Sequence, residues 1–438
     1  MPGGEITLRL PGRSRLQFPV HIELINTGSE LLLGRVLNTH QQWICRQLAD
    51  HGYEVTRQIC VADDGPSIQA AARESLGRAD LVLTTGGLGP TADDMTRDLI
   101  AQLLGRPLAL DAAVRARIEE YFAQRHRVMP HSVNVQAMVP AGARVLPNRH
   151  GTAPGLAMHV DPNPFREDKR GSWLILLPGP PRELRPMFTE AVLPLVLKEF
   201  PLAGPFVCRT LHTTGLGESS VEEKITGPLQ PLQGAGLELG YCARIGEVDV
   251  RLVARGEKAA ALVSEAEGII RPLLGPLIFG ADDATLESTV VQLMAKQKKT
   301  VALAESCTGG LIAHRITNVP GASAVLVCGL VTYSNDAKKN LLGVREETLR
   351  EHGAVSAGVA RQMAEGARSR YGTDYGLAVT GIAGPGGGSA QKPVGTVFIA
   401  LAGVQGTTVG ERFNPFDRET FKFVTSQQAL DLLRRALP

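Results

Sequence analysis

The sequence lacks the features that mark secreted, membrane-spanning or strongly nucleic-acid-binding proteins. Its six cysteines are spread over 438 residues without a CxxC pair, which argues against a disulfide framework and a zinc motif and favours a reducing, cytoplasmic setting. No run approaches the ~20 apolar residues that span a bilayer, and no apolar core of signal-peptide length precedes Gly28. The net charge is +2, and no basic stripe with interleaved aromatic side chains is present, so a nucleic-acid partner is not expected.

The composition instead supplies the material for several soluble domains. Apolar residues make up 43% of the chain and charged residues 21%, which is ordinary for a globular protein. At roughly 100–200 residues per domain, the length predicts two to four domains. Residues 1–19 are expected to form a disordered extension.

Strand and helix signals divide the remaining chain into three blocks. Residues 20–200 alternate strands and helices, which predicts an α/β domain with a mainly parallel sheet covered by helices. Residues 205–283 indicate a small α+β linking domain, and residues 285–438 a second α/β domain.

The helix boundaries are expected at capping residues and glycines. Ser29 and Gly52 should bound one long helix in the first block. In the third block, Asn335 should cap a short helix that ends at Gly343, and Ser356 should cap the helix that follows.

The stretch AESCTGG follows an apolar strand and leads into a helix. It places two candidate nucleophiles, Ser306 and Cys307, at a turn where the N–H groups of a helix N-terminus attract anions or a developing oxyanion. Thr308 adds a hydroxyl, and Gly309 and Gly310 let a ligand approach the backbone closely. A capped helix with glycines for tight packing explains the same residues equally well, so this stretch alone leaves both interpretations open.

A serine needs a neighbouring base to become a good nucleophile, and TYSNDAKKN offers one. Lys338 falls in the first turn of its expected helix, where the helix dipole disfavours a cation and helps to lower the lysine pKa. A lysine kept neutral by partial burial can act as a base, and Tyr333 could relay or orient the proton. The spacing alone favours the alternative, in which Lys338 is as solvated as its neighbour Lys339.

A third loop, TGIAGPGGGS, follows another buried strand. Gly384, Gly386 and Gly387 give it the open backbone that suits a phosphate or a ribose, although it is neither GxGxxG nor a P-loop. Loops that follow parallel strands gather at the carboxyl end of the sheet, so we expect the three stretches to meet there.

The first block carries its own glycine-rich turn, TTGGLGPTADDMTRD. Gly86, Gly87 and Gly89 can cradle a phosphate, and the adjacent carboxylates Asp93 and Asp94 can hold a hard divalent cation beside it. Acidic residues also favour helix N-termini for electrostatic reasons alone. The preceding glycines tip the interpretation towards a functional site.

Residues 285–438 resemble the C-terminal domain of the CinA family, the nicotinamide mononucleotide deamidase domain. The matching stretches are AESCTGG, VTYSNDAKKNLLGV, GAVS, AVTGIAGPGGG and KPVGTVFIAL. The resemblance implies hydrolysis of nicotinamide mononucleotide to nicotinate mononucleotide and ammonia without a metal. It implies that Ser306 is the nucleophile, Lys338 and Tyr333 the base and its assistant, and Arg418 in FDRETFKF a ligand of the substrate phosphate.

Residues 20–200 are similar to the molybdopterin-binding domain in its CinA version, through TGSELLLG, GGLGPTADD, GTAPG and LPGPPRELRPMF. This resemblance implies a three-layer fold and a metal-dependent ADP-ribose pyrophosphatase that yields AMP and ribose 5-phosphate. A divalent cation (Mg, Mn or Co) would be bound by Asp93 and Asp94. The further pocket residues that it implies are Glu30, Asn38 and Arg182.

Three interpretations compete. The leading one is a cytoplasmic pyridine-nucleotide salvage enzyme with two activities, which acts on small nucleotides and is a homodimer by family resemblance. A second keeps the deamidase but makes the first domain a silent ligand-binding module. A third is a non-catalytic molybdopterin- or nucleotide-binding protein linked to competence. The set Ser306, Tyr333 and Lys338 favours an enzyme, because a binding module has no reason to combine them.

Overall fold

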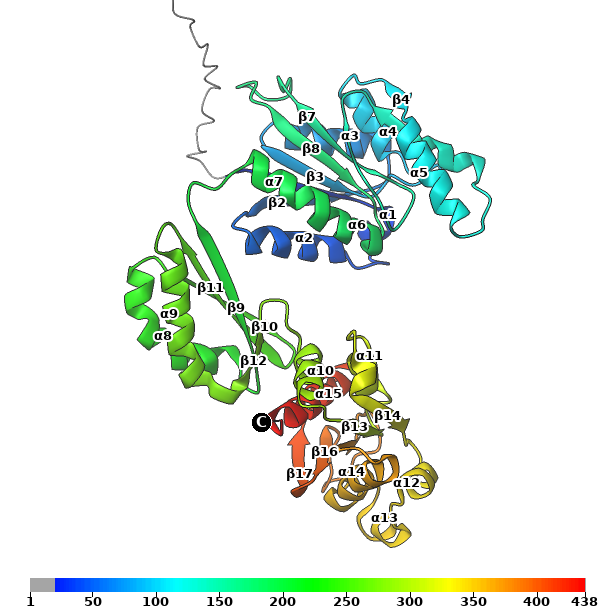
Figure 1. The fold of residues 1–438 in the computed structure, drawn as a ribbon, viewed down its shortest axis with the longest axis vertical. Helices are drawn as coiled ribbons and strands as arrows, with labels where there is room; N and C mark the ends of the chain where they lie inside the picture. Colours follow the sequence, from blue (N-terminus) through cyan, green and yellow to red (C-terminus); the bar gives the residue numbers. More distant parts are fainter. Residues whose placement is uncertain (1–19, 438) are drawn as a thin grey trace, which may run out of the picture. The chain divides into compact units, whose positions relative to one another are not determined.

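The computed structural model describes residues 20–437, which form two compact units that divide between Val207 and Cys208 (Figure 1). The extension expected over residues 1–19 lies outside the described residues. Among residues 20–437, no helix combines the length and the apolar character that crossing a membrane requires.

The first unit is built on a six-stranded sheet. Its strands are β1 (Ile22–Thr27), β2 (Val55–Val61), β3 (Leu81–Thr85), β6 (Arg144–Leu146), β7 (Gly155–Val160) and β8 (Ser172–Leu177). Their order is β2-β1-β3-β8-β7-β6, with the first four parallel and the last two antiparallel to their neighbours. The chain moves from β1 to β2 and then crosses to β3 on the other side, so the carboxyl end of β1 is a topological switch point.

Helices cover both faces of this sheet, which confirms the predicted three-layer fold. Ile22 and Leu24 of β1 pack against one helical layer, whereas Ile25 faces the other. The helices on one face are α2 (Thr39–Asp50), α6 (Pro181–Met187) and α7 (Leu193–Glu199), and those on the other are α3 (Gly65–Leu76), α4 (Thr96–Leu103) and α5 (Ala112–Ala123).

The single helix expected over residues 29–52 is wrong, because the chain breaks after one turn. Helix α1 (Ser29–Leu32) takes Ser29 as its first residue rather than as its cap. Gly34 then adopts a left-handed φ of 66°, which ends the helical path. The Asn38 side chain caps the start of α2 and begins a separate helix there.

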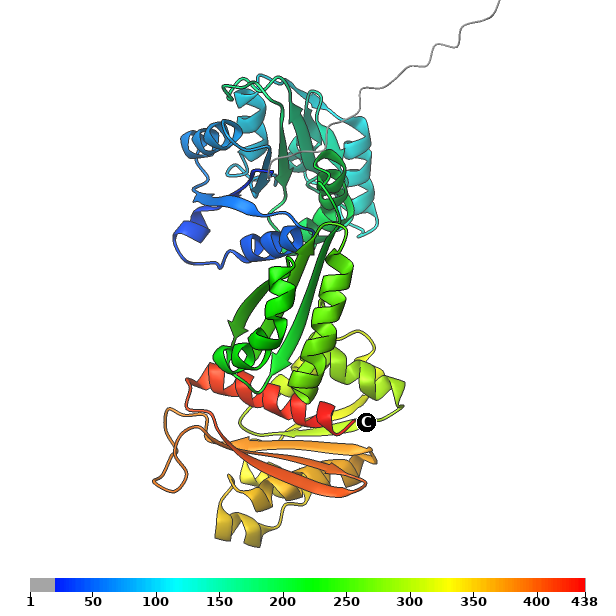
Figure 2. The same cartoon turned by 90° about the vertical axis from the view of Figure 1, so that its left-hand side faces the viewer.

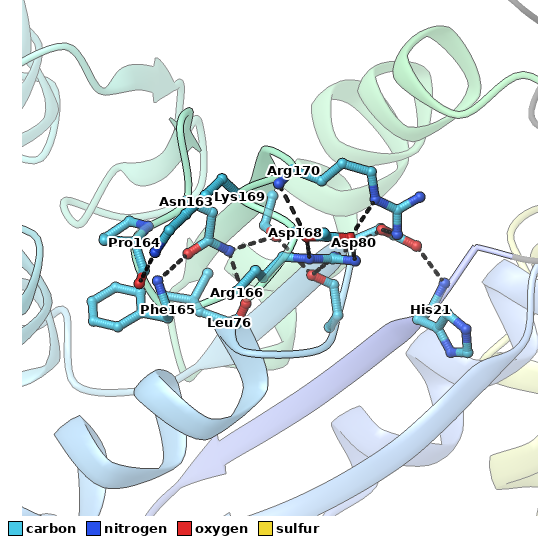
Figure 3. Close-up of polar contacts among 12 residues, drawn as sticks. His21, Leu76, Asp80, Asn163, Pro164, Phe165, Arg166, Asp168, Lys169 and Arg170 are labelled. Atoms are coloured by element: carbon cyan, nitrogen blue, oxygen red, sulfur yellow. Dashed lines mark hydrogen bonds and ion pairs between the residues drawn. The ribbon is translucent and has the colours of Figure 1, made fainter.

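An ion-pair cluster fixes the loop between β7 and β8 (Figure 3). Arg166, with a side chain only 7% exposed, donates to Asp80 and Asp168 at 2.9 and 3.0 Å. Arg170 pairs with the same two carboxylates, and Asn163 donates to the last carbonyl of α3. Because Asp80 directly precedes β3, the cluster lies at the amino end of that strand, opposite the switch point.

The second unit begins with a four-stranded sheet and two helices. The strands are β9 (Phe206–Thr214), β10 (Glu238–Arg244), β11 (Glu247–Arg255) and β12 (Ile278–Ala281), in the order β10-β11-β9-β12, and the helices are α8 (Glu218–Gly234) and α9 (Ala259–Leu274). Within the sheet, His212 is buried and its two ring nitrogens lie 2.6 Å from an Asp249 oxygen and 2.7 Å from the Asp282 carbonyl oxygen. Burial alone would lower the pKa of His212, but these two acceptors raise it above its ordinary value.

The second unit continues with a five-stranded sheet in the order β14-β13-β15-β16-β17. Its strands are β13 (Val301–Glu305), β14 (Leu326–Val331), β15 (Tyr375–Gly381), β16 (Thr396–Gly403) and β17 (Gly406–Phe413). The first three strands along the chain are parallel, and β16 and β17 are antiparallel. Strand β17 was not expected from the sequence.

Figure 2 shows α15 lying along one face of this sheet, opposite the helices of the other face. That face is covered by α10 (Leu286–Lys296), α11 (Leu311–Thr317) and α15 (Arg418–Arg435), and the other by α12 (Asn335–Leu342) and α14 (Ala357–Tyr371). Ser334, rather than the expected Asn335, caps α12, because its side chain accepts the Ala337 N–H. Ser356 caps α14 as expected.

Small residues bring α14 close to the sheet and to α12. Ala302 and Ala304 of β13 pack against α14. Gly366 of α14 lies over the end of α12, so that a Cβ added there would stand 1.9 Å from the Leu342 carbonyl oxygen. No side chain fits at this crossing without a shift of the backbone.

Gly366→Ala should therefore destabilise the second unit by about 1–3 kcal/mol, because the new methyl group overlaps a backbone oxygen. Gly268→Ala is the matched control, because Gly268 also lies inside a helix but a Cβ there meets no atom within 4 Å. The control should stabilise the unit by about 0.5–1 kcal/mol through its higher helix propensity. Denaturant unfolding compares the two variants, and effects of the same sign and size would contradict this packing argument.

Candidate active sites

The first candidate site lies at the carboxyl ends of β13, β14 and β15. Because β13 is flanked by the other two strands, the loops that follow all three meet at one edge of the sheet. Glu305 pairs in register with Val331 and Val379, so Ser306 and Thr332 are the next residues on two adjacent strands. This pairing brings AESCTGG and TYSNDAKKN together, although 26 residues separate Ser306 from Thr332 in the chain.

Glu305 holds the turn that follows β13. Its buried carboxylate accepts hydrogen bonds from the Thr308 hydroxyl at 2.7 Å and from the N–H groups of Gly310, Ile312 and Ala313 at 3.0, 3.1 and 2.8 Å. The positive end of α11 is therefore already paired with an anion. Sequence reasoning missed Glu305, although an acidic residue at a strand end just before a helix is the available signal.

The Lys338 side chain extends from α12 to the AESCTGG loop, which contains Ser306. Its side chain is only 1% exposed, and its Nζ lies 3.1 Å from Ser306 Oγ, 2.8 Å from the Thr332 carbonyl oxygen and 3.1 Å from that of Tyr333. Burial lowers the pKa of Lys338 below its ordinary value. The solvated alternative is therefore wrong, and burial is the main cause of the lowered pKa.

Cys307 has no comparable activation. The thiol is buried, and burial raises its pKa to about 12, although Lys338 opposes the effect. A thiol with that pKa carries almost no thiolate at neutral pH, and the thiolate is the nucleophilic form. The local chemistry favours Ser306 over its neighbour.

Tyr333 and Arg418 join the second and third loops. Arg418, the first residue of α15, donates to the Gly384 carbonyl at 2.8 Å and to the Tyr333 hydroxyl at 2.9 Å. Tyr333 is 59% exposed, and it accepts a hydrogen bond from Lys338 through its backbone carbonyl, not through its hydroxyl. Gly386 and Gly387 lie in the exposed part of the third loop.

The second candidate site is a cleft of about 390 Å³ in the first unit, at the carboxyl ends of β1, β3 and β8. Gly86 and Gly87 have left-handed φ angles of 101° and 67°. Gly89 lies under the Asp94 carboxylate, so that a Cβ there would meet it at 2.2 Å. The predicted residues that line the cleft are Glu30, Gly86, Gly87, Gly89, Asp93 and Asp94.

Carboxylates dominate the lining of this cleft. Among the described residues that line it, five are acidic and none is lysine or arginine. The five are Glu30, Asp63, Asp93, Asp94 and Glu183. Burial raises the pKa of Glu183, and its carboxylate accepts a hydrogen bond from Asn148. The sequence analysis did not identify Asp63 or Glu183. In place of Glu183 it named the neighbouring residue, Arg182.

Two predicted pocket residues do not line the cleft. Asn38 is used as the N-cap of α2, and Arg182 has a side chain that is 75% exposed and lies 3.8 Å from Glu183. Arg182 therefore approaches the cleft only at Glu183, which is one of its lining residues.

The acidic lining fits a divalent cation that also binds the substrate. Over residues 20–437, no three His, Cys, Asp or Glu side chains come close enough to form a complete metal site. Asp94 also accepts from the Thr91 N–H at 3.0 Å, while Asp93 is exposed. Mg²⁺ commonly binds through one or two carboxylates together with substrate phosphates. Asp93 and Asp94 fit that mode, because a bound cation would offset the negative charge of the cleft for an incoming phosphate.

Comparison with known families assigns each part of the chain. The model of the CinA C-terminal domain matches residues 283–437, that of the probable molybdopterin binding domain residues 23–198, and that of the damage-inducible protein CinA KH domain residues 208–280. The last match gives the small α+β domain a KH-like identity that sequence reasoning did not recognise.

Similar proteins cover nearly the whole chain. A CinA-like protein of Akkermansia muciniphila is 45% identical over 94% of this chain and 96% of its own length. A putative competence-damage inducible protein of Symbiobacterium thermophilum is 47% identical over 87% of this chain and 88% of its own. One of Moorella thermoacetica is 43% identical over 95% and 98%. The chain therefore belongs to the CinA family, with a molybdopterin-binding-like domain, a KH-like domain and a CinA C-terminal domain.

Proposed function

We propose that the C-terminal domain hydrolyses nicotinamide mononucleotide to nicotinate mononucleotide and ammonia. The observation that carries the proposal is the buried Lys338 Nζ at 3.1 Å from Ser306 Oγ. A serine beside an amine whose pKa is lowered by burial is suited to acyl transfer, and a carboxamide is the acyl donor that releases ammonia. The choice of substrate is supported by the likeness of AESCTGG and AVTGIAGPGGG to the deamidase motifs of the family.

The carbonyls around Lys338 set the direction of proton transfer. A neutral amine has two N–H groups, and the Thr332 and Tyr333 carbonyls can accept both. The lone pair is then free to accept the hydrogen of Ser306 Oγ. After the transfer, the same three oxygens accept all three N–H groups of the ammonium, so both protonation states are satisfied.

The reaction then follows a covalent course. Ser306 Oγ forms a bond to the carboxamide carbon while its proton passes to Lys338. The C–N bond breaks, Lys338 returns the proton to the leaving nitrogen, and ammonia departs. Water attacks the resulting nicotinoyl ester with Lys338 as base again, which releases the acid and restores Ser306. These steps use only Ser306, Lys338, water and the substrate, and no metal ion takes part in them.

The developing oxyanion needs donors that the fold has not already used. Glu305 takes the first N–H groups of α11, and those of Ser306 and Gly309 bond to backbone carbonyls. In the described part of the chain, the N–H groups of Cys307 and Thr308 lie against the Cys307 sulfur and have no oxygen acceptor. We therefore assign the oxyanion to these two groups.

We further propose that the first unit hydrolyses the pyrophosphate of ADP-ribose with a divalent cation. Asp93 and Asp94 would hold the cation, which supplies charge neutralisation for the two phosphates. The glycine-rich turn provides backbone N–H groups beside them. Glu183, whose pKa is raised by burial, is the candidate proton carrier of the cleft.

We also propose a cytoplasmic homodimer that acts on free nucleotides rather than on nucleic acid or a membrane. Six free cysteines support the reducing compartment. A non-catalytic, competence-linked binding protein is the second candidate, and it is supported by the names of relatives such as the competence-damage inducible protein of Symbiobacterium thermophilum.

Replacing the two candidate nucleophiles separates their roles. Ser306→Ala should lower the rate of ammonia release from nicotinamide mononucleotide by at least about 10³-fold, because it removes the attacking atom. Cys307→Ala should retain most of the activity, since the buried thiol takes no part. A coupled ammonia assay measures both variants, and the opposite pattern would make Cys307 the nucleophile.

The lowered pKa of Lys338 predicts the pH dependence. Only the neutral amine accepts the serine proton, so kcat/KM should rise with pH through the pKa of Lys338 and then level off. Lys338→Arg should remove this rise and nearly all activity, because arginine stays protonated. A pH–rate profile of both proteins provides the test, and a wild-type rate that falls over the same range would mean that the ammonium is the active form.

Chelation should separate the two activities in one preparation. EDTA is expected to stop the release of AMP from ADP-ribose and to leave ammonia release from nicotinamide mononucleotide unchanged, because only the first site uses a cation. Asp93→Asn should raise the Mg²⁺ concentration needed for half-maximal ADP-ribose hydrolysis by about 10-fold or more. ADP-ribose hydrolysis that survives complete chelation would contradict the metal assignment.

A further inference from the structure

A second cation of α15 lies beside the turn over residues 306–310, which contains Ser306 and is called the nucleophile turn below. Lys422 follows Arg418 by four residues, so the two side chains project from the same face of the helix. Lys422 Nζ stands 3.8 Å from the position that a Cβ would occupy on Gly309. Gly309 has a left-handed φ of 62° and belongs to the turn that follows Ser306. The ammonium thus lies against the backbone of the catalytic loop at a point where no side chain separates them.

Lys422 has no partner within the described residues. No hydrogen bond or ion pair within residues 20–437 involves its ammonium, although Glu419 lies one turn before it. Arg418, in contrast, is held by the Gly384 carbonyl and the Tyr333 hydroxyl. Two like charges at this spacing repel each other unless an anion lies near them. Arg418 is therefore held by contacts within the fold, whereas the Lys422 ammonium is available to bind a ligand.

The surroundings of Lys422 provide room for a ligand. The side chain is half-buried and lines a cavity of about 580 Å³ together with the apolar side chains Leu311, Phe423 and Ile245. The other charged side chains of this lining are Arg244 and Glu247, which pair with each other at 3.3 Å, and Glu419. Leu311 begins the helix that follows the nucleophile turn. A partly desolvated ammonium in such a cavity attracts an anion more strongly than an ammonium in water does.

We propose that Lys422 binds the phosphate of nicotinamide mononucleotide and determines the preference of the deamidase site for nucleotides over nucleosides. This inference rests on the proposed deamidase function. The phosphate is a dianion near neutral pH and accepts charge-assisted hydrogen bonds from an ammonium. Gly309 lets a phosphate oxygen approach the loop while Ser306, three residues earlier, attacks the carboxamide at the other end of the substrate. Arg418 then acts mainly as the tie between the second and third loops.

The test compares two substrates that differ only in the phosphate. Lys422→Ala should lower kcat/KM for nicotinamide mononucleotide on the order of 10- to 100-fold through KM, because one charge-assisted contact is lost. The values for nicotinamide riboside, which has no phosphate, should stay unchanged. Lys422→Arg should restore most of the loss, and Lys224→Ala, which removes a cation from the exposed side of α8, should have no effect.

Each outcome decides the inference. A selective loss for the nucleotide with rescue by arginine supports it. An equal loss for both substrates, a loss in kcat alone, or no loss would overturn it while leaving the deamidase function intact. Absence of ammonia release by the wild-type protein would instead overturn the deamidase function, and the role of Lys422 with it.

Discussion

The buried contact between Lys338 and Ser306 is the interaction on which the account depends. Removing an ammonium from water costs several kcal/mol, so the fold must either compensate the charge or keep the amine neutral. Burial lowers the pKa of Lys338, which favours the neutral amine, and the fold surrounds Nζ with two carbonyls and one hydroxyl at hydrogen-bond distance. The parallel pairing of β13 with β14 makes this possible, because it places Ser306 beside Thr332. Lys338 is therefore buried and oriented towards Ser306, as the proposed role of a base requires.

The two α/β domains place their candidate sites in the same way in the sheet but line them with side chains of opposite charge. In each, the first strand of the sheet lies between the second and third, and the candidate site opens at its carboxyl end. The C-terminal site contains Lys338, whose pKa is lowered by burial, and the basic side chains Arg418 and Lys422 of α15. The N-terminal cleft gathers carboxylates without a lysine or arginine in its described lining. The fold therefore determines where each candidate site lies, and the loop residues determine the charge of its lining.

The sequence predicted the parallel strands that carry the two candidate sites, the meeting of three loops and the cap at Ser356, because apolar runs and capping residues are local signals. It could not predict the burial of Lys338, since Lys338 and Lys339 look alike in sequence and only tertiary packing separates them. Glu305 and Glu183 were missed because their roles arise from contacts with backbone amides and with Asn148. The prediction of one helix over residues 29–52 was wrong, because the left-handed turn at Gly34 interrupts the helix despite the apolar pattern.

The central claim is that Ser306 carries the acyl group during turnover. Rapid acid quenching of the full-length protein with nicotinamide mononucleotide, followed by mass spectrometry of its peptides, tests this most directly. The account predicts a nicotinoyl ester on Ser306 that is absent from Ser306→Ala and accumulates in wild-type protein before hydrolysis. An adduct on Cys307, or turnover without any covalent adduct under conditions that trap one, would contradict it.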